Sequence, residues 1–395
     1  MHLPLEGIRV LAIEQFGAGP YGSMYLADLG AEVIKIENRA SGGDPARYTG
    51  SELLADDDSA YFQAFNLNKK SVTLNLKSDR GRQLFHQLVA SADIVWNNLR
   101  GNQPALLGLD YRSLKNVNPD IICTHISAYG RDNDRAEWPG YDYLMQAECG
   151  FLELTGEPDS PPARFGLSMV DFMTGVVAGL AALAALIGRA RHGGRDVDVS
   201  LFDVALHQLT YPGTWYLNHG IETERIARSS HPSNTPVQLY RTADGWIFIM
   251  CMTQKFWELL IDEMGRTELA GDARFCDMRA RTGHRDELTR LLDEAFSTDT
   301  TENWIRRLQT KVPVAPVHDL AQALDNPFVE QIGMIQTMPH RTAGTFRALC
   351  NPIKLDAHRL AGEPGHGLGA DNEALLGGEL ELEEPLESLR DRGVV

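Results

Sequence analysis

Residues 8–37 have the pattern of a strand, a helix and a second strand in direct succession. The first strand, residues 8–13, is apolar and bounded by turn residues, and the second covers residues 31–37. Between them, apolar residues at 24–29 follow a helical spacing that ends at Gly30, a residue typical of helix C-caps. A unit of this kind, about thirty residues long, implies two parallel strands joined by a right-handed crossover.

The alternation of strands and helices continues beyond this unit. Further strands are expected at residues 71–76, 92–96, 121–127 and 197–201. Helices are expected at residues 79–91, 141–151, 176–190 and 202–216, with a loop at 41–59. Strands that alternate with helices in this way predict an α/β fold with a Rossmann-like, doubly wound sheet.

The composition changes after residue 218, and a chain of 395 residues favours two domains. Residues 237–250 have the pattern of a hairpin, followed by three amphipathic helices. We therefore predict the first part of a large domain at residues 1–227 and a smaller α+β domain at 228–325. Residues 326–395 are expected to return to the large domain and to end in an acidic, exposed tail.

Asp171 lies directly before an apolar run, residues 172–187. The run is short, rich in Gly and Ala and flanked by charges, which favours a core helix over a membrane span. A carboxylate at a helix N-terminus lies in the positive end of the helix dipole, so Asp171 is expected to be ionised and poorly hydrated. Such a group suits a nucleophile, but an N-cap is the commoner role of Asp at this place. The residues alone leave both interpretations open.

Gly17, Gly19 and Gly22 form a GxGxxG motif between the first strand and its helix, and Glu37 ends the second strand. This pattern is typical of dinucleotide binding, with the acidic residue on a ribose. Pro20 weakens that interpretation, because it removes an amide that would hold a pyrophosphate. A close approach of the backbone to some other ligand is an equal alternative.

The formal net charge is −17, which argues against nucleic acid and anionic membranes as partners. Residues 1–135 carry 14 Lys and Arg against 16 Asp and Glu, so an anionic ligand meets least repulsion there.

The five cysteines are scattered and form no CxxC pair, which favours a reducing cytoplasm over disulfides or zinc. The twelve histidines show no metal-ligand spacing, and His125 is interpreted as a core residue.

Five ordered blocks of this chain resemble the family III CoA-transferases, the group of formyl-CoA:oxalate and carnitine CoA-transferases that is related to α-methylacyl-CoA racemase. The blocks are LEGIRVLAIEQFGAGPYGSMYLADLGAEVIKIE, FNLNKKSVTLNLKSDRGRQLF, PGYDYLMQAECGFLELTG, SMVDFMTGVVAGLAALAAL and GGRDVDVSLFDVAL. They cover residues 3–205 strongly, and residues 228–360 are similar more loosely.

The resemblance implies that Asp171 is the catalytic nucleophile. It implies that CoA contacts Phe16, Gly17, Ala18, Arg39, Leu74, Lys77, Asn98, Leu99 and Arg100, and that Tyr141 and Asp142 belong to a substrate-binding segment. CoA and acyl-CoA are then substrates, and no cofactor or metal is expected. The family fold implies an interlocked homodimer in which each monomer is threaded through the other.

The resemblance also bears on the substrates. Oxalate-specific members carry Gln where this chain has Gly17, and a glycine-rich loop is not found near residues 229–236. A family arginine for a CoA phosphate aligns near Leu106, so Arg100 is its expected substitute. The racemase branch has a catalytic histidine where this chain has Tyr141, which favours transfer over racemisation.

The expected activity moves CoA from an acyl-CoA, with succinyl-CoA as a plausible donor, to a carboxylic acid such as a dicarboxylate. A racemase, an NAD-dependent oxidoreductase and a non-catalytic CoA-binding protein remain the alternatives.

Overall fold

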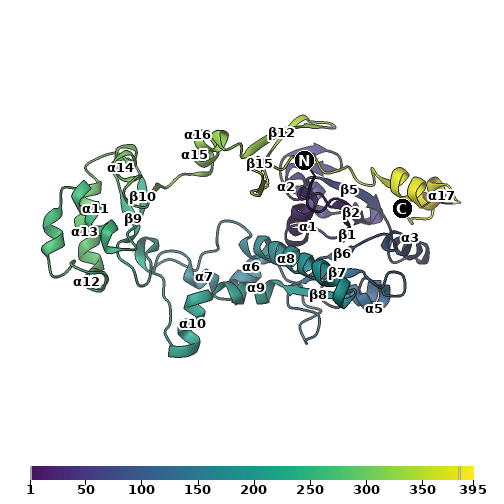
Figure 1. Cartoon of the computed structure of the whole chain (residues 1–395), viewed down its shortest axis with the longest axis horizontal. Helices are drawn as coiled ribbons and strands as arrows, with labels where there is room; N and C mark the ends of the chain where they lie inside the picture. The colour runs from purple at the N-terminus through teal and green to yellow at the C-terminus, as the bar shows by residue number, and fades with distance from the viewer. Residues whose placement is uncertain (1, 381, 383) are drawn as a thin grey trace. The chain divides into compact units, whose positions relative to one another are not determined.

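The computed structural model describes residues 2–380, 382 and 384–395. The chain divides into two compact units (Figure 1). The large unit comprises the residues up to Cys149 together with Gly166–Leu209 and Pro327–Val395, and the small unit comprises Gly150–Phe165 and Thr210–Asn326.

A sheet of six parallel strands forms the centre of the large unit, in the order β5-β2-β1-β6-β7-β8. The strands are β1 (Arg9–Ile13), β2 (Glu32–Glu37), β5 (Lys69–Thr73), β6 (Ile94–Asn97), β7 (Ile122–Ser127) and β8 (Arg195–Ser200). The chain starts in the middle of the sheet, builds one side and then the other, which is the doubly wound Rossmann order. The predicted α/β class with a parallel sheet is confirmed.

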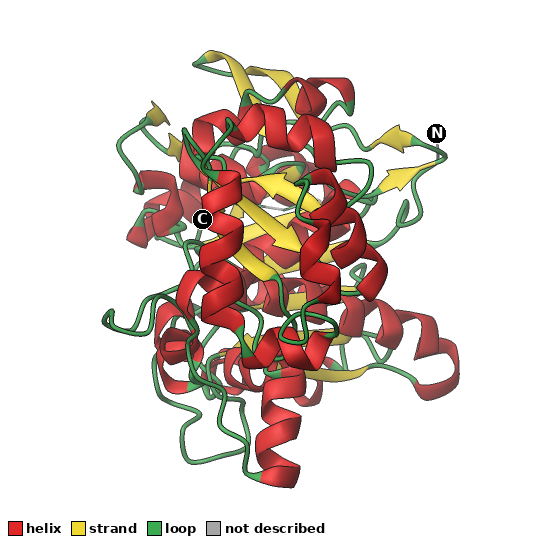
Figure 2. Cartoon of the chain, turned by 90° about the vertical axis from the view of Figure 1, so that its left-hand side faces the viewer, coloured by secondary structure: helices red, strands yellow, loops and turns green. Residues whose placement is uncertain are grey.

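Helices cover the strands of the sheet (Figure 2). The long helix α8 (Met169–His192) packs on β7, β8 and α1 (Ala18–Asp28). A separate apolar core joins the strands to α3 (Asp79–Val89), α5 (Tyr111–Leu114), the π-helix η5 (Glu373–Glu379) and α17 (Leu386–Asp391). The central strands are buried, and they carry polar and charged side chains such as Lys35 and Lys69 beside the apolar ones.

Helices α1 and α8 approach closely because small residues lie where they cross. A Cβ atom on Gly22 would lie 2.4 Å from the carbonyl oxygen of Gly175. A Cβ atom on Gly175 would lie 2.5 Å from the carbonyl oxygen of Ala18. The third glycine of the GxGxxG motif therefore serves helix packing, and this packing brings the N-terminal ends of both helices together.

The structure excludes one of the two interpretations left open for Asp171 and corrects two expectations about other elements. Helix α8 begins at Met169 with Ser168 as its N-cap, so Asp171 lies inside the first turn and is not the cap. Strand β5 covers Lys69–Thr73 and so begins two residues before the expected start. Its backbone pairs with β2 from Lys69 onward, and this pairing sets its bounds. The C-terminal tail is not exposed throughout, since Leu386, Leu389 and Val394 are buried in the core of the large unit; residues 381 and 383 lie outside the described part.

The rest of the large unit consists of short elements. The expected loop at 41–59 contains η1 (Arg39–Ser41), η2 (Pro45–Tyr48), β3 (Leu53–Ala55) and β4 (Asp58–Ser59). The other elements are α2 (Ala60–Asn66), α4 (Gln103–Leu107), α6 (Asp142–Glu148), α9 (Leu201–Gln208), α16 (Pro327–Gln331), β12 (Ile335–His340), β13 (Gly344–Leu349), β14 (Lys354–Leu355) and β15 (His358–Arg359).

The small unit has a three-stranded antiparallel sheet, β11-β10-β9. The predicted hairpin is formed by β9 (Val237–Arg241) and β10 (Trp246–Met250), and β11 (Val314–Pro316) adds an edge. Its helices are α7 (Phe151–Leu154), α10 (Thr210–His219), η3 (Ala227–Ser229), α11 (Gln254–Glu263), η4 (Thr267–Gly271), α12 (Met278–Gly283), α13 (Arg285–Phe296), α14 (Thr301–Leu308) and α15 (Leu320–Leu324). An aromatic core holds them together, with Tyr240, Trp257, Phe296 and Trp304 buried.

Candidate active site

A cavity of about 410 Å³ opens at the carboxyl ends of β1 and β6. These two neighbouring strands form the switch point at which the sheet order reverses, and ligands of doubly wound sheets bind there. The cavity is lined by Gln15, Phe16, Gly17, Ala18, Asn98, Leu99, Arg100, Gln103, Ile126, Ser127, Ala128, Trp138, Pro139, Gly140, Tyr141, Asp171 and Leu201. All of these residues belong to the large unit.

Asp171 reaches this cavity from the first turn of α8, and Asp142 holds that turn. The backbone N–H of Asp171 donates to Oδ2 of Asp142 at 3.0 Å. Gln146 donates to Oδ1 of the same carboxylate at 2.5 Å. In the described structure the side chain of Ser168 makes no capping hydrogen bond, so Asp142 supplies an acceptor that α8 otherwise lacks.

The carboxylate of Asp171 is poorly solvated. No hydrogen bond or ion pair to it is found among the described residues. Burial, and secondly the nearby charge of Asp142, raise the pKa of Asp171 to about 7. The sequence predicted an ionised, poorly hydrated group; the poor hydration itself raises the pKa, because loss of hydration outweighs the helix dipole here. At pH 7 such a carboxyl group is present in both protonation states, which is the range in which a nucleophile or base can act.

The first two glycines of the GxGxxG motif face side chains of the site. A Cβ atom on Gly17 would lie 2.5 Å from Oδ2 of Asp171. A Cβ atom on Gly19 would lie 2.7 Å from the side-chain amide carbon of Asn98. The first two glycines of the motif therefore allow the backbone to lie close to the side chains of Asp171 and Asn98; the expected approach to a ligand stays a prediction.

Glu37 is not free to bind a ribose. Its side chain is buried and pairs with the buried guanidinium of Arg47 at 2.7 and 2.8 Å. Burying this charge is tolerable because the two groups form a bidentate ion pair. The acidic residue that the dinucleotide pattern needs is thus committed to the interior, and that interpretation of Glu37 was wrong.

Seven of the residues implied by the resemblance line the cavity beside Asp171: Phe16, Gly17, Ala18, Asn98, Leu99, Arg100 and Tyr141. Arg39, Leu74, Lys77 and Asp142 are not among the described lining residues. Leu74 is buried in the core, and Asp142 lies behind Asp171. Arg39 and Lys77 are exposed outside the cavity, where they could meet only a part of a ligand that extends beyond it.

Some lining residues were missed by sequence reasoning. Ile126, Ser127 and Ala128 end or follow β7, and Leu201 follows β8. The rule that ligands bind at the carboxyl ends of parallel strands would have indicated them. Trp138–Gly140 lie in a charged loop between elements, and no local pattern places that loop at the site.

His125 is a satisfied core residue, as predicted. It is buried, with Nε2 2.9 Å from Oδ1 of Asp196 and Nδ1 2.8 Å from the side-chain amide of Asn97. Among residues 2–380, 382 and 384–395, no group of three or more His, Cys, Asp or Glu side chains is placed to hold a metal ion.

The fold and the site together define an α/β protein with an enzyme-type centre, in which a poorly solvated carboxylate faces a cavity at the switch point. Residues 5–372 match the family model described as CoA-transferase family III. The chain belongs to this family and is a CoA-transferase.

Known proteins support this assignment. The chain is 36% identical over 360 residues to an acyl-CoA transferase of Fusarium pseudograminearum, covering 89% of this chain and 79% of the relative. It is 33% identical over 393 residues to a succinate–glutarate CoA-transferase of Agrobacterium fabrum, covering 96% of each. Its structure matches the crystal structure of a CAIB/BAIF family protein from Brucella suis with a TM-score of 0.82, at 32% identity, over 95% of this chain and 99% of the other. The resemblance stated from the sequence is confirmed.

Arg100 and Lys77 allow a test of where the CoA phosphates bind. Arg100 lines the cavity and Lys77 does not, so we expect Arg100→Ala to weaken acyl-CoA binding by about 1–3 kcal/mol. Lys77→Ala should cost less, and the matched exposed control Arg112→Ala should change little. Calorimetric titration with an acyl-CoA measures all three. Equal losses for Arg100→Ala and Arg112→Ala would show that the cavity does not bind CoA.

Proposed function

We propose that this protein moves CoA from an acyl-CoA to a carboxylic acid, with succinyl-CoA as donor and a dicarboxylate as acceptor, in the cytoplasm. The relative named succinate–glutarate CoA-transferase, which matches over 96% of both chains, supports this pair of substrates. The observation that carries the chemistry is Asp171, a poorly hydrated carboxylate at the switch-point cavity.

In the proposed mechanism, an oxygen of Asp171 attacks the thioester carbonyl, the C–S bond breaks, and CoA leaves as a thiolate. The product is a mixed anhydride between Asp171 and the acyl group. The thiolate then attacks the aspartyl carbonyl and releases the donor acid, which leaves CoA as a thioester on Asp171. The acceptor carboxylate then attacks this aspartyl thioester and releases CoA as a thiolate, which gives a second mixed anhydride. The thiolate attacks the acceptor's carbonyl in that anhydride, which forms the new acyl-CoA and returns Asp171 as a carboxylate, so that bonds and charges balance. A nucleophile with few hydrogen bonds, in a site from which water is excluded, suits this sequence.

The turn at Gly17 supports the proposal through its backbone. The first intrahelical hydrogen bond of α1 runs from the N–H of Tyr21 to the carbonyl of Gly17. The N–H groups of Ala18 and Gly19 precede that bond, so they can donate to an oxyanion formed next to Asp171. A helix N-terminus without side-chain capping, as described for α1, suits that role.

A mass-spectrometric screen tests the proposed substrates. The protein is incubated with succinyl-CoA and a panel of mono- and dicarboxylic acids, and new acyl-CoA species are measured. We expect fastest transfer to a dicarboxylate. Transfer to none of the acids, or hydrolysis alone, would overturn the proposed function.

The raised pKa predicts the pH dependence of the first half-reaction. The nucleophile must be deprotonated, so the rate should rise tenfold per pH unit below about 7 and reach a plateau above it. Asp142→Asn removes a nearby negative charge, which should move the midpoint below that of the unmodified protein. Single-turnover release of CoA at pH 5–9 measures both. A rate that falls as pH rises from 6 to 8 would contradict the assignment.

We also propose that the protein is an interlocked homodimer. Helix α8 supports this, because its exposed face carries an apolar stripe of Met173, Val176, Leu180 and Ile187 at helical spacing. Helix α8 as a whole is long and apolar enough for a membrane span by length and composition. Asp171 in its first turn and its packing on α1 suit an interface within a protein instead. Sedimentation at micromolar concentration should show a dimer, whereas Leu180→Glu should weaken it. A monomer with full transfer activity would refute the dimer.

A further inference from the structure

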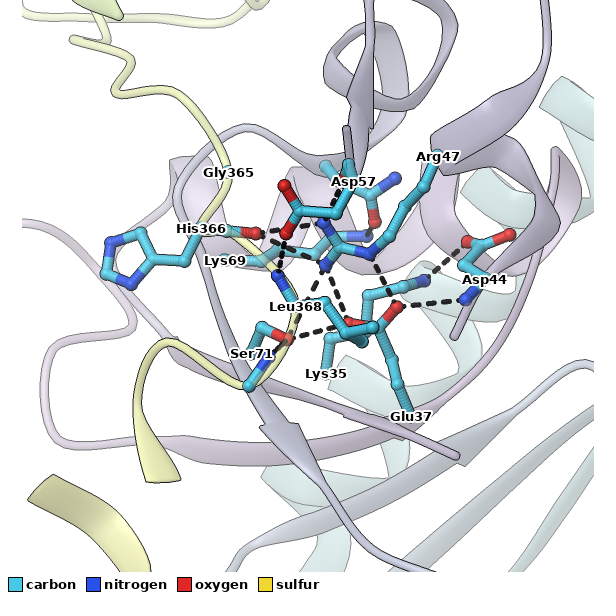
Figure 3. A network of polar contacts seen from close by, with 12 residues as sticks. Lys35, Glu37, Asp44, Arg47, Asp57, Lys69, Ser71, Gly365, His366 and Leu368 are labelled. Carbon is cyan, nitrogen blue, oxygen red and sulfur yellow. Dashed lines mark hydrogen bonds and ion pairs between the residues drawn. The ribbon is translucent and has the colours of Figure 1, made fainter. Parts of the chain in front are cut away.

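Four buried charged residues lie beneath the turn that faces Asp171: Glu14, Lys35, Asp44 and Lys69. Figure 3 shows the last three, with Lys35 paired to Asp44. Lys69 contacts Oε1 of Glu14 at 2.7 Å, and Lys35 contacts Oδ2 of Asp44 at 2.9 Å. We call these four residues the buried charge cluster. Its two positive and two negative groups balance, which makes their burial tolerable.

The two lysines also bind the backbone at both ends of the turn. Nζ of Lys35 donates to the carbonyl of Glu14 at 3.1 Å, and Nζ of Lys69 donates to the carbonyl of Pro20 at 2.9 Å. From the other side, the amide of Asn98 pairs with both the N–H and the carbonyl of Gln15, at 2.9 and 2.7 Å. The backbone of residues 14–20 is therefore held at several points.

Asp44 holds the residue at the bend of this turn. Its Oδ1 accepts the N–H of Phe16 at 3.2 Å and the N–H of Ala46 at 2.9 Å. Phe16 has a φ of 59°, a left-handed conformation that a bulky side chain rarely adopts without support. The next residue is Gly17, whose backbone faces the Asp171 carboxylate.

We propose that Asp44 is a positioning residue for CoA transfer: by holding the N–H of Phe16, it keeps the Phe16–Gly17 turn bent against the Asp171 carboxylate. The inference rests on the proposed function, since it assumes that Asp171 reacts. Asp44 is buried and does not line the described cavity, so it acts through Phe16. The fixed turn aims the N–H groups at the start of α1 toward the reacting carbonyl, where small displacements weaken catalysis strongly.

The buried charge cluster also links the site to the C-terminal segment. The N–H of Asp44 donates to Oε2 of Glu37 at 3.0 Å, and Arg47, the partner of Glu37, donates to the carbonyl of His366 at 3.2 Å (Figure 3). The segment around His366 thus packs behind the loop that carries Asp44. The contacts of Glu37 and Arg47 therefore hold Asp44 in place. A residue that positions another group must itself be held by its neighbours.

A pair of matched variants separates the acceptor role of Asp44, toward the N–H groups of Phe16 and Ala46, from its charge. Lys35→Met with Asp44→Asn removes both charges but keeps an acceptor for the N–H of Phe16. Lys35→Met with Asp44→Ala removes the same charges and the acceptor. Both variants lose the contact of Lys35 with the carbonyl of Glu14, so the test is the comparison between them: we expect kcat of the Ala variant to lie about 10- to 100-fold below kcat of the Asn variant. KM for the acyl-CoA should change less than about threefold in both.

Thermal unfolding and acyl-CoA titration show whether the variants are folded. If the Ala variant does not fold, Lys35→Met with Asp44→Leu, which refills the volume without an acceptor, replaces it. Equal kcat values for the Asn variant and its acceptor-free partner would overturn the proposal. Failure of both acceptor-free variants to fold, while the Asn variant folds, would also overturn it, because Asp44 would then serve the fold alone.

A second readout separates this inference from the proposed function. The rate at which succinyl-CoA forms a covalent adduct on Asp171 is measured by mass in the unmodified protein and in each variant. Adduct formation that is normal in the unmodified protein and slowed in the Ala variant supports Asp44 as a positioning residue. No adduct in the unmodified protein refutes the proposed function. An adduct that forms equally fast in all of them refutes the role of Asp44 alone.

Discussion

Asp171→Asn is expected to lose transfer activity by about four orders of magnitude or more. The amide keeps the size of the side chain but cannot attack the thioester as an oxygen anion. Acyl-CoA should still bind, because the cavity keeps its other lining residues. The unmodified protein incubated with acyl-CoA alone should carry a covalent adduct on the peptide that contains Asp171, and hydroxylamine should convert it to a hydroxamate visible by mass.

Stability provides a control for this variant. The pKa of Asp171 is raised to about 7 in the folded protein, above its value in an unfolded chain, so the folded state binds the proton more tightly. Stability therefore falls as pH rises from about 4 to 7, because a poorly solvated charge must form. Asp171→Asn removes that charge, and its melting temperature should exceed that of the unmodified protein at pH 8, with a smaller difference at pH 5. Near-normal transfer by this variant would refute the nucleophile and with it the reaction mechanism.

Gly17→Ala is expected to reduce kcat by about 100-fold while the protein stays folded. An ideal Cβ atom there would lie 2.5 Å from Oδ2 of Asp171, so either the carboxylate or the turn must move. Gly188→Ala is the matched control, since its Cβ would meet the ring of His192 at an ordinary 3.5 Å. Steady-state transfer and thermal unfolding of both variants give the comparison.

The outcome distinguishes two roles of the motif. A large loss of kcat with an unchanged melting temperature places Gly17 at the reacting carboxylate. Unchanged turnover in a folded Gly17→Ala variant would show that the turn does not approach the reaction. Loss of folding would instead assign to Gly17 the packing role that the structure gives to Gly22.

Local patterns predicted the order of strands and helices, the apolar helix behind Asp171 and the core role of His125. They failed at β5 and in the C-terminal tail. The register of β5 is set by pairing with β2, and Leu386 and Leu389 are buried by strands far away in the sequence. Periodicity within a segment reports which face of it is apolar, but it does not report which partner covers that face.

The interpretation of Glu37 shows the same limit. Its place at the end of a strand agreed with ribose binding, and nothing near it in the sequence marked Arg47 as its partner. Only the folded chain shows the bidentate ion pair that removes Glu37 from any ligand. A motif gives the spacing of residues along the chain, whereas a site depends on which atoms meet in space.

The sequence by itself determined the parallel α/β architecture and the family, because these follow from periodicity and from motifs of contiguous residues, and through the family resemblance it pointed to Asp171 as the proposed nucleophile. The tertiary structure decided the state of that carboxylate. Its pKa near 7 arises from burial and from Asp142, 29 residues away. The structure also decided which residues hold the turn at residues 15–17 that faces Asp171, since Asn98 and Asp44 reach this turn from other segments. Hydration and hydrogen bonding are properties of atoms brought together by folding, so no local pattern in the chain specifies them.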